Sequence, residues 1–323
     1  MTSRTGQSAN RHYVRAAALG TTLALLATLL WAGNFVLARG LRDAIPPTAL
    51  NFWRWAIAVT VLAPFALRTI LAARHVLRRH LGYLSLTGLL GITVFNTLVY
   101  QAGHTTQATN LALIAVCSPI VIVVFAWLFS GEPITVRTAL ALVVAASGVL
   151  LLITDGSLGK LVNLDFAAGD LIMLLATVVF GTYTVLVGRK PDELPITAFV
   201  FSTFVLGLLM LLPAYLLELS VTAPFPFDLN NTAALLYIGV FPSLVAFYSW
   251  NRAVTTIGTT RPAMIYYLVP VFTGLAGWFF LDEPISVAQI LAMMLVIAGV
   301  AVSQLPTRRS ARAPTHASAS RGG

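Results

Sequence analysis

The chain has 323 residues, of which 58% are hydrophobic and only 10% are charged, and its mean hydropathy is +0.86. A soluble domain carries about 25% charged residues, so this chain has too few charges to cover a surface exposed to water. Segments 20–38, 81–103 and 105–131 contain no charged residue and are long enough to cross a membrane. The composition therefore predicts an all-α polytopic membrane protein and excludes a soluble enzyme or binding module.

Three further classes are excluded by simple features. The net charge of +9 comes from basic residues dispersed among apolar segments, so we expect no nucleic-acid partner. The single cysteine, Cys117, excludes a disulfide framework and a cysteine-based metal site. An outer-membrane barrel would show alternating segments of about ten residues in place of unbroken apolar ones. We expect no cofactor, no metal ion and no catalytic residues.

Ten membrane-spanning helices are predicted. The first follows Arg4, Arg11 and Arg15 as a signal peptide would, but its apolar run of about 20 residues is too long for a cleaved signal. We therefore interpret it as an uncleaved span. The predicted spans are 19–38, 48–67, 81–102, 108–129, 134–153, 168–187, 195–217, 233–253, 261–281 and 286–305. Residues 306–323, rich in Ala, Ser, Arg and Pro, are predicted to be a disordered tail.

The distribution of Lys and Arg predicts the orientation. With both termini on one side of the membrane, that side collects sixteen of the 20 basic residues, the opposite side collects three, and Arg54 lies within a span. Loops rich in Lys and Arg remain in the cytoplasm. We therefore expect a bacterial inner-membrane protein with a cytoplasmic N-terminal segment (1–18) and a cytoplasmic tail (306–323).

The sequence repeats itself at an offset of about 150 residues. Ala27–Arg39 resembles Ala176–Arg189, and Glu132-Pro133-Ile134 recurs as Glu283-Pro284-Ile285. The first repeat is predicted over 19–153 and the second over 168–305, with an external linker at 154–167. Because each repeat has five spans, the second must enter the membrane inverted, which is typical of secondary transporters with a central site between the halves.

Several motifs resemble those of a known family. Trp31-Ala32-Gly33-Asn34-Phe35 resembles the first-helix motif of EamA-type repeats, and Pro119 with Leu128–Pro133 resembles the motif that ends their fourth helix. Val269-Pro270 and Phe280–Pro284 repeat that second motif. The chain is thus similar to drug/metabolite transporter superfamily members with two EamA domains, and to YddG-like bacterial amino-acid exporters. The resemblance implies export of small metabolites.

Two pairs of residues are candidates for hinges or gates. Pro119 and Pro270 lie near the middle of spans four and nine, where a proline frees the carbonyl four residues earlier. The freed backbone either lines a cavity or only kinks the helix for packing. Glu132 and Glu283 precede the last helix of each repeat, where a carboxylate is expected to stabilise that helix N-terminus. The alternative is that they form gate contacts with arginines such as Arg137.

Arg54 is the one basic residue within a predicted span, about 9 Å from its outer end. Trp53 and Trp55 flank it, and tryptophans favour the membrane interface. We expect the side chain to extend outward to that interface; the alternative is a carboxylate-binding arginine in the outer vestibule.

Polar and aromatic residues within the spans are candidates for solute binding. Span three carries a polar face that includes Asn96 and Tyr100, and such faces point into a helix bundle. Aromatic residues in the central zones suit flat or apolar solutes, although packing is the alternative. The candidate substrate-binding residues are Trp31, Asn34, Arg54, Asn96, Tyr100, Tyr183, Tyr248, Tyr266 and Tyr267.

The leading hypothesis is a secondary transporter that moves small organic metabolites, favouring aromatic or hydrophobic amino acids, by alternating access. No Asp or Glu lies deep within a span, which favours transport without proton coupling. The alternatives are a nucleotide-sugar or drug carrier of the same superfamily, a channel, and a membrane-embedded enzyme, which the positions of the five histidines disfavour. The expected partners are a small solute and the lipid bilayer, and one chain is sufficient for a central site.

Overall fold

The computed structural model describes the backbone of residues 3–41, 45–105, 111, 114–154, 156, 159, 168–281 and 285–305. Side chains are described for these residues except 3–13, 34–41, 104–105 and 280–281. Every regular element in these ranges is a helix. Asn34 and Glu283, two of the predicted site residues, therefore have side chains outside the described part of the chain.

Nine described helical segments, each of one to three consecutive elements, are long and apolar enough to cross a membrane, and the shorter apolar helix Cys117–Ser130 adds a tenth, in agreement with the ten predicted spans. The first-repeat elements are α1 (Ser3–Leu41), α2 (Pro47–Arg79), α3 (Leu81–Gly88), η1 (Leu89–Val94), α4 (Phe95–Thr105), α6 (Cys117–Ser130) and α7 (Val136–Thr154). The second-repeat elements are α9 (Ala168–Gly188), α10 (Ile196–Val221), α11 (Leu229–Ile238), η2 (Gly239–Val245), α12 (Ala246–Ile257), α13 (Thr260–Tyr266), α14 (Leu268–Leu281) and α15 (Val287–Gln304).

The second helix is longer than the span predicted from the sequence. α2 continues from the predicted end near residue 67 to Arg79. Residues 68–79 contain no Gly or Pro, so nothing in this segment interrupts the helix once the apolar part has ended. The basic end of α2 therefore projects beyond the apolar part of the bundle.

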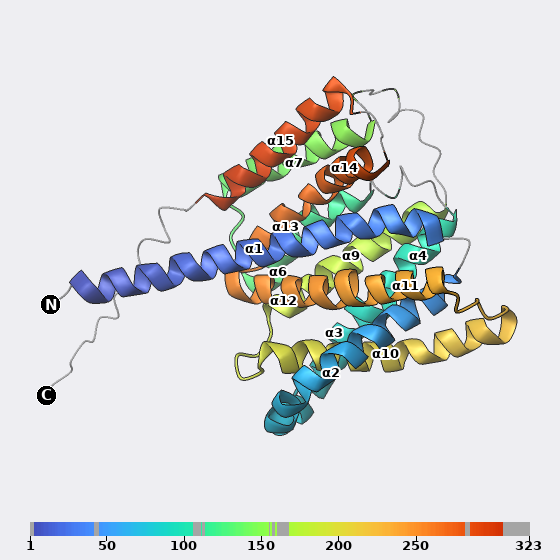
Figure 1. Cartoon of the computed structure of the whole chain (residues 1–323). Coiled ribbons are helices and arrows are strands. Elements are labelled where there is room, and N and C mark those ends of the chain that lie inside the picture. The colour runs from blue at the N-terminus through green and yellow to red at the C-terminus, as the bar shows by residue number, and fades with distance from the viewer. Residues whose placement is uncertain are drawn as a thin grey trace, which may run out of the picture.

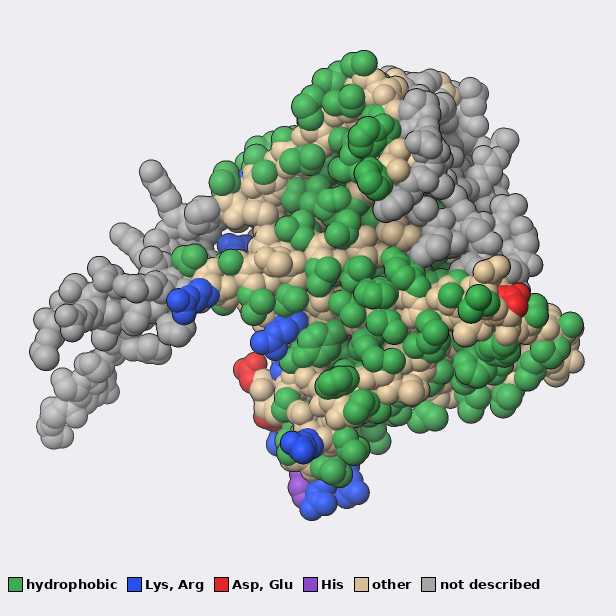
Figure 2. Space-filling model, in the orientation of Figure 1, with side chains coloured by type: hydrophobic (Ala, Val, Ile, Leu, Met, Phe, Trp, Pro, Cys, Tyr) green, Lys and Arg blue, Asp and Glu red, His purple; other side chains and the backbone are tan. Residues whose placement is uncertain are grey.

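The helices form one bundle with two distinct ends (Figure 1). α1 begins and α15 ends at the left of Figure 1, and α2 ends at its lower left; we call this side the N-end and the opposite side the far end. Hydrophobic side chains cover the middle of the visible face, and Lys and Arg side chains gather toward the N-end (Figure 2). An apolar belt with a basic end is the surface expected of a membrane protein.

Helix pairing follows the internal repeat. α1 packs against α12 as its counterpart α9 packs against α4, and α1 packs against α14 as α9 packs against α6. Two other extensive pairs form between equivalent helices of the two repeats: α2 packs against α10, and α7 packs against α15. Exchanging the two repeats therefore reproduces the same set of contacts, as a duplication with inverted topology predicts.

Small residues allow α7 and α15 to approach closely. A Cβ atom on Gly148 would lie 2.8 Å from the backbone nitrogen of Val296, and one on Gly299 would lie 2.8 Å from that of Ala145. Glycine permits such backbone contact between helices within a bilayer, where packing drives association. The crossing of α7 and α15 is thus reciprocal and depends on a glycine from each repeat.

The helices that cross the centre of the bundle are interrupted. Spans three and eight contain the π-helical segments η1 and η2, and η2 includes Pro242, which has no N–H to donate. Span nine breaks at Tyr267, three residues before Pro270, and α6 begins at Cys117, two residues before Pro119. Each proline thus lies just after an interruption of its span, and its role as a hinge or in lining a cavity stays a prediction. π-Helical segments are frequent at functional sites.

Candidate functional site

Five aromatic rings meet at the centre of the bundle around Trp31. Phe180 of α9, Phe247 and Trp250 of α12 and Tyr266 of α13 have ring centroids 5.3 to 6.0 Å from that of Trp31. We call these five residues the Trp31 cluster. Trp31 belongs to the first repeat and its four partners belong to the second, so the cluster lies at the interface between the repeats.

The Trp31 cluster is closely packed in this conformation. All of its side chains except the half-buried Tyr266 are buried, with exposed fractions between 0 and 8%. The ring pairs with Trp31 are edge-on or tilted, which are favourable arrangements for aromatic quadrupoles. The Trp31 Nε1 atom donates a hydrogen bond to the Pro242 carbonyl of η2 at 3.0 Å. A solute can therefore occupy the centre only when the rings separate.

Arg54 is connected to this cluster through the consecutive residues Pro242 and Ser243 of η2. Its side chain is only 3% exposed, so the expectation that it extends to the membrane interface is wrong. The Nε atom donates to Ser243 Oγ at 2.6 Å, and Nη1 donates to Asn96 Oδ1 at 3.3 Å and to the Tyr100 hydroxyl. These interior acceptors draw the guanidinium into the bundle. We call Arg54, Asn96, Tyr100 and Ser243 the Arg54 cluster.

The helix interruptions explain why these acceptors are available. Pro242 cannot donate to the Ile238 carbonyl, and the Ser243 hydroxyl donates to that carbonyl instead, at 2.8 Å. Ser243 Oγ thereby turns its lone pairs toward Arg54. The Asn96 amide likewise donates to the η1 carbonyl of Gly91 at 3.0 Å, which fixes Oδ1 as the atom that faces the guanidinium.

The other predicted binding residues lie nearer the N-end. The Tyr183 hydroxyl donates to Asn251 Oδ1 at 2.8 Å, and both side chains are fully buried. Tyr267 is 2% exposed, and its hydroxyl has no hydrogen-bond partner among the described residues. Tyr248 is only half-buried, and its hydroxyl contacts Thr197 Oγ1 at 3.0 Å. Tyr248 therefore joins α12 to α10.

Comparison with known proteins identifies the family. The model of the EamA-like transporter family matches residues 18–154 and 167–304. The chain belongs to the EamA-like transporter family. Each matched stretch contains one of the two sequence repeats, so this EamA protein combines two EamA units in one membrane-embedded chain.

Similar proteins agree with this assignment. An uncharacterized transporter of Bacillus subtilis, YyaM, is 28% identical over 83% of this chain and 87% of its own length. A probable terminal-alkyne amino-acid exporter of Streptantibioticus cattleyicolor is 26% identical over 90% of this chain and 96% of its own length. A crystal structure that is 22% identical, with a TM-score of 0.72 over 90% of this chain and 98% of the other, shows the same fold.

Two glutamates of the EamA protein join the repeats at helix N-termini. Glu132 accepts hydrogen bonds from the backbone N–H groups of Thr259 and Thr260 at 2.8 and 3.0 Å, and from the Thr260 hydroxyl at 2.6 Å. The expectation that Glu132 stabilises the helix that follows it in sequence is therefore wrong. It caps α13 of the other repeat, and Thr135 caps α7 by accepting from the Thr138 N–H at 3.1 Å.

The far end has a comparable contact that the sequence analysis missed. Glu218 of α10 accepts hydrogen bonds from the backbone N–H groups of Thr48 and Ala49, at 3.0 and 2.7 Å, in the first turn of α2. A carboxylate at this position satisfies free N–H groups and complements the helix dipole. Glu132 at the N-end and Glu218 at the far end thus each connect one repeat to the other.

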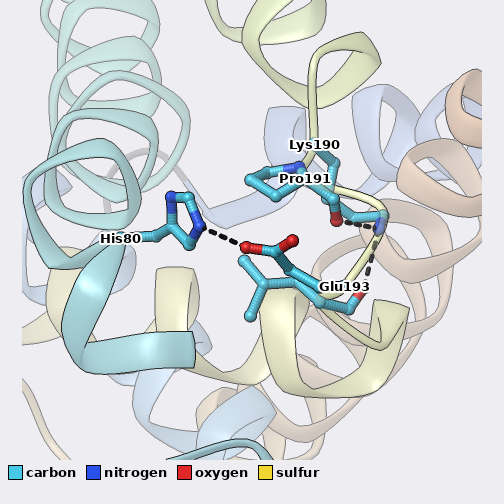
Figure 3. Close-up of polar contacts among 5 residues, drawn as sticks. His80, Lys190, Pro191 and Glu193 are labelled. Atoms are coloured by element: carbon cyan, nitrogen blue, oxygen red, sulfur yellow. Dashed lines mark hydrogen bonds and ion pairs between the residues drawn. The ribbon is translucent and has the colours of Figure 1, made fainter. Parts of the chain in front are cut away.

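A second polar contact joins the repeats at the N-end of the EamA protein (Figure 3). His80, between α2 and α3, contacts Glu193 with 2.9 Å between Nε2 and Oε1, and this hydrogen bond holds the pKa of the Glu193 carboxyl below its usual value. Lys190 donates to the carbonyls of Pro191 and Leu194, both at 2.7 Å. Partial burial lowers the pKa of the Lys190 ammonium.

Proposed function

We propose that this protein is a secondary carrier that moves small organic metabolites across the membrane by alternating access. One observation carries the proposal: the Trp31 and Arg54 clusters adjoin each other at the interface between the two repeats, through the consecutive residues Pro242 and Ser243. A central site between inverted repeats is open to either side of the membrane when the repeats rock against each other. Each cluster contains residues of both repeats, so rocking would rearrange both.

We further propose amino acids with aromatic or hydrophobic side chains as the favoured substrates. Aromatic rings provide contact area for an apolar side chain, and a neighbouring guanidinium pairs with a carboxylate. The name of the relative from Streptantibioticus cattleyicolor, a probable amino-acid exporter, supports this class and the direction of export. A nucleotide sugar would need several buried basic groups for its phosphates, and Arg54 is the only buried Lys or Arg among the described side chains.

The orientation and the energy source are part of the proposal. The gathering of Lys and Arg at the N-end supports cytoplasmic termini in a bacterial inner membrane. The Trp31 and Arg54 clusters contain no Asp, Glu or His, which supports transport down a gradient without proton coupling.

A reconstitution assay tests the proposal. Purified protein in liposomes is offered labelled amino acids, nucleotide sugars and cationic drugs, with and without an imposed proton gradient. The proposal predicts saturable flux of aromatic or hydrophobic amino acids that is unchanged by the gradient. Flux of another class alone would refute the substrate assignment, and flux only with the gradient would refute uncoupled transport. As a matched control, Leu128→Ala removes an exposed apolar side chain of α6 and should leave flux unchanged.

A further inference from the structure

Arg54 is a buried cation whose hydrogen-bond partners are all neutral. Its contacts are with the side-chain oxygens of Asn96, Tyr100 and Ser243, and no carboxylate contacts it within the described part of the chain. A buried charge without an opposite charge is strongly destabilising, and proteins normally pair it or neutralise it. An arginine cannot be neutralised by losing its proton. The resting site therefore carries a positive charge that the surrounding residues do not balance.

The surroundings hold the charge in place without cancelling it. Two aromatic faces lie near the guanidinium carbon, at 5.4 Å for Trp55 and 6.0 Å for Tyr100. Ring faces attract a cation but contribute no negative charge. The third guanidinium nitrogen, Nη2, has no hydrogen-bond partner among the described residues. The edge of the planar group that carries Nη2 thus has N–H donors left for an anion.

We propose that Arg54 is the residue that recognises the transported solute, and that the recognised group is a carboxylate. This inference rests on the proposed carrier function and specifies which group of the substrate is recognised. None of the side chains in the Arg54 and Trp31 clusters carries a negative charge that would pair with an ammonium group. The substrate class is therefore monocarboxylates with an aromatic or apolar body, and an amino group is not required for recognition.

A purely structural role for Arg54 makes a different prediction. The same hydrogen bonds connect α2, α4 and η2, so a structural arginine would affect stability equally with every solute. A recognition role instead predicts an effect that depends on whether the solute has a carboxylate. The two roles are separated by varying the solute on the unaltered protein, which requires no variant to fold.

The first experiment measures competition with labelled phenylalanine flux in proteoliposomes of the wild-type protein. The competitors are phenylalanine, 3-phenylpropionate, which lacks the amine, and phenylalaninol and phenylalaninamide, which lack the carboxylate. We expect phenylalanine and 3-phenylpropionate to compete similarly and the other two to be about 10- to 100-fold weaker, the effect of losing a hydrogen bond to a charged group. Equal competition by phenylalaninol would overturn the inference while leaving the carrier function intact.

The second experiment uses variants of Arg54 with a matched control. Arg54→Lys keeps the charge and Arg54→Gln removes it, whereas Arg68→Gln removes an exposed charge from the same helix. Thermal unfolding of each purified variant is followed with and without 3-phenylpropionate. The acid should raise the unfolding temperature of wild type, Arg68→Gln and, less strongly, Arg54→Lys, but not of Arg54→Gln. If the acid raises the unfolding temperature of Arg54→Gln as much as that of wild type, the inference fails. If the acid changes the unfolding temperature of none of these proteins and no flux is seen, the carrier proposal for this substrate class fails as well.

Discussion

The contact between Glu132 and the start of α13 provides a quantitative test of how the repeats are held together at the N-end. Glu132→Ala removes the acceptor of three hydrogen bonds and leaves the N–H group of Thr259, a buried residue, without a partner. Hydrogen bonds to a charged acceptor contribute about 1.5–3 kcal/mol each, and the partial exposure of Glu132 places them at or below the low end. The three together amount to about 3 kcal/mol.

That free energy acts only on conformations in which the end of α6 lies against the start of α13. Because 1.4 kcal/mol is a tenfold change in an equilibrium, its loss should shift the balance toward an open N-end by about 100-fold. Spin labels on the exposed residues Ser130 and Arg252, in a Cys117→Ala background, report the distance between the repeats. We expect Glu132→Ala to add a population at longer distance and Glu132→Gln to give a smaller effect.

The control is Glu193→Ala, which removes an exposed carboxylate at the same end. It should change the distance distribution less than Glu132→Ala does, because only one hydrogen bond is lost. An unchanged distribution in Glu132→Ala, together with an unchanged unfolding temperature, would refute the argument that this contact stabilises the closed N-end.

Three further predictions concern stability and the central rings. Gly148→Leu should lower the unfolding temperature markedly, because the leucine side chain would collide with the backbone of α15. The control Gly82→Ala should leave the unfolding temperature unchanged, because the added Cβ meets nothing within 4 Å. Thermal unfolding in detergent measures both variants. Glu193 has a lowered pKa in the folded protein, so its stabilising effect is present above the usual carboxyl pKa of 4.5 and is lost as the pH falls below it. Glu193→Gln should therefore flatten the pH dependence of the unfolding temperature below pH 4.5, and an identical slope in both proteins would contradict this. Trp31→Phe keeps an aromatic ring but loses the hydrogen bond to η2, so we expect the free energy of unfolding to fall by about 1 kcal/mol and the solute flux to change. Wild-type flux in this variant would argue against a role for Trp31 in the site.

Local features of the sequence were sufficient to predict the architecture. Apolar length predicts the spans, because this effect depends on residues close together in the chain. Pro119 and Pro270 were placed near the middle of spans four and nine, and both lie just after an interruption of the helix. Trp31, Tyr266, Asn96 and Tyr100 were correctly singled out as interior residues, although their role in binding stays a prediction.

Contacts between distant segments were not predictable in the same way. Arg54 is flanked by two tryptophans, a local pattern typical of the membrane interface, but its direction is determined by Ser243, 189 residues away. Ser243 itself was missed, although its position directly after a proline within a span is a usable signal. Glu218 at the end of α10 and the actual partner of Glu132 also depend on which helix ends meet in space. A single sequence does not contain that information.

The close crossing of α7 and α15 has a mechanical consequence for the proposed rocking motion. This pair contributes one helix from each repeat, and Gly148 and Gly299 each lie against the backbone of the partner helix. Sliding either helix along the other would bring larger side chains into the space that only glycine fits, so translation is opposed while rotation about the crossing point is not. In the proposed motion the pair would act as a pivot: it would keep the repeats at a constant separation while their ends move, so that opening at one end would accompany closing at the other.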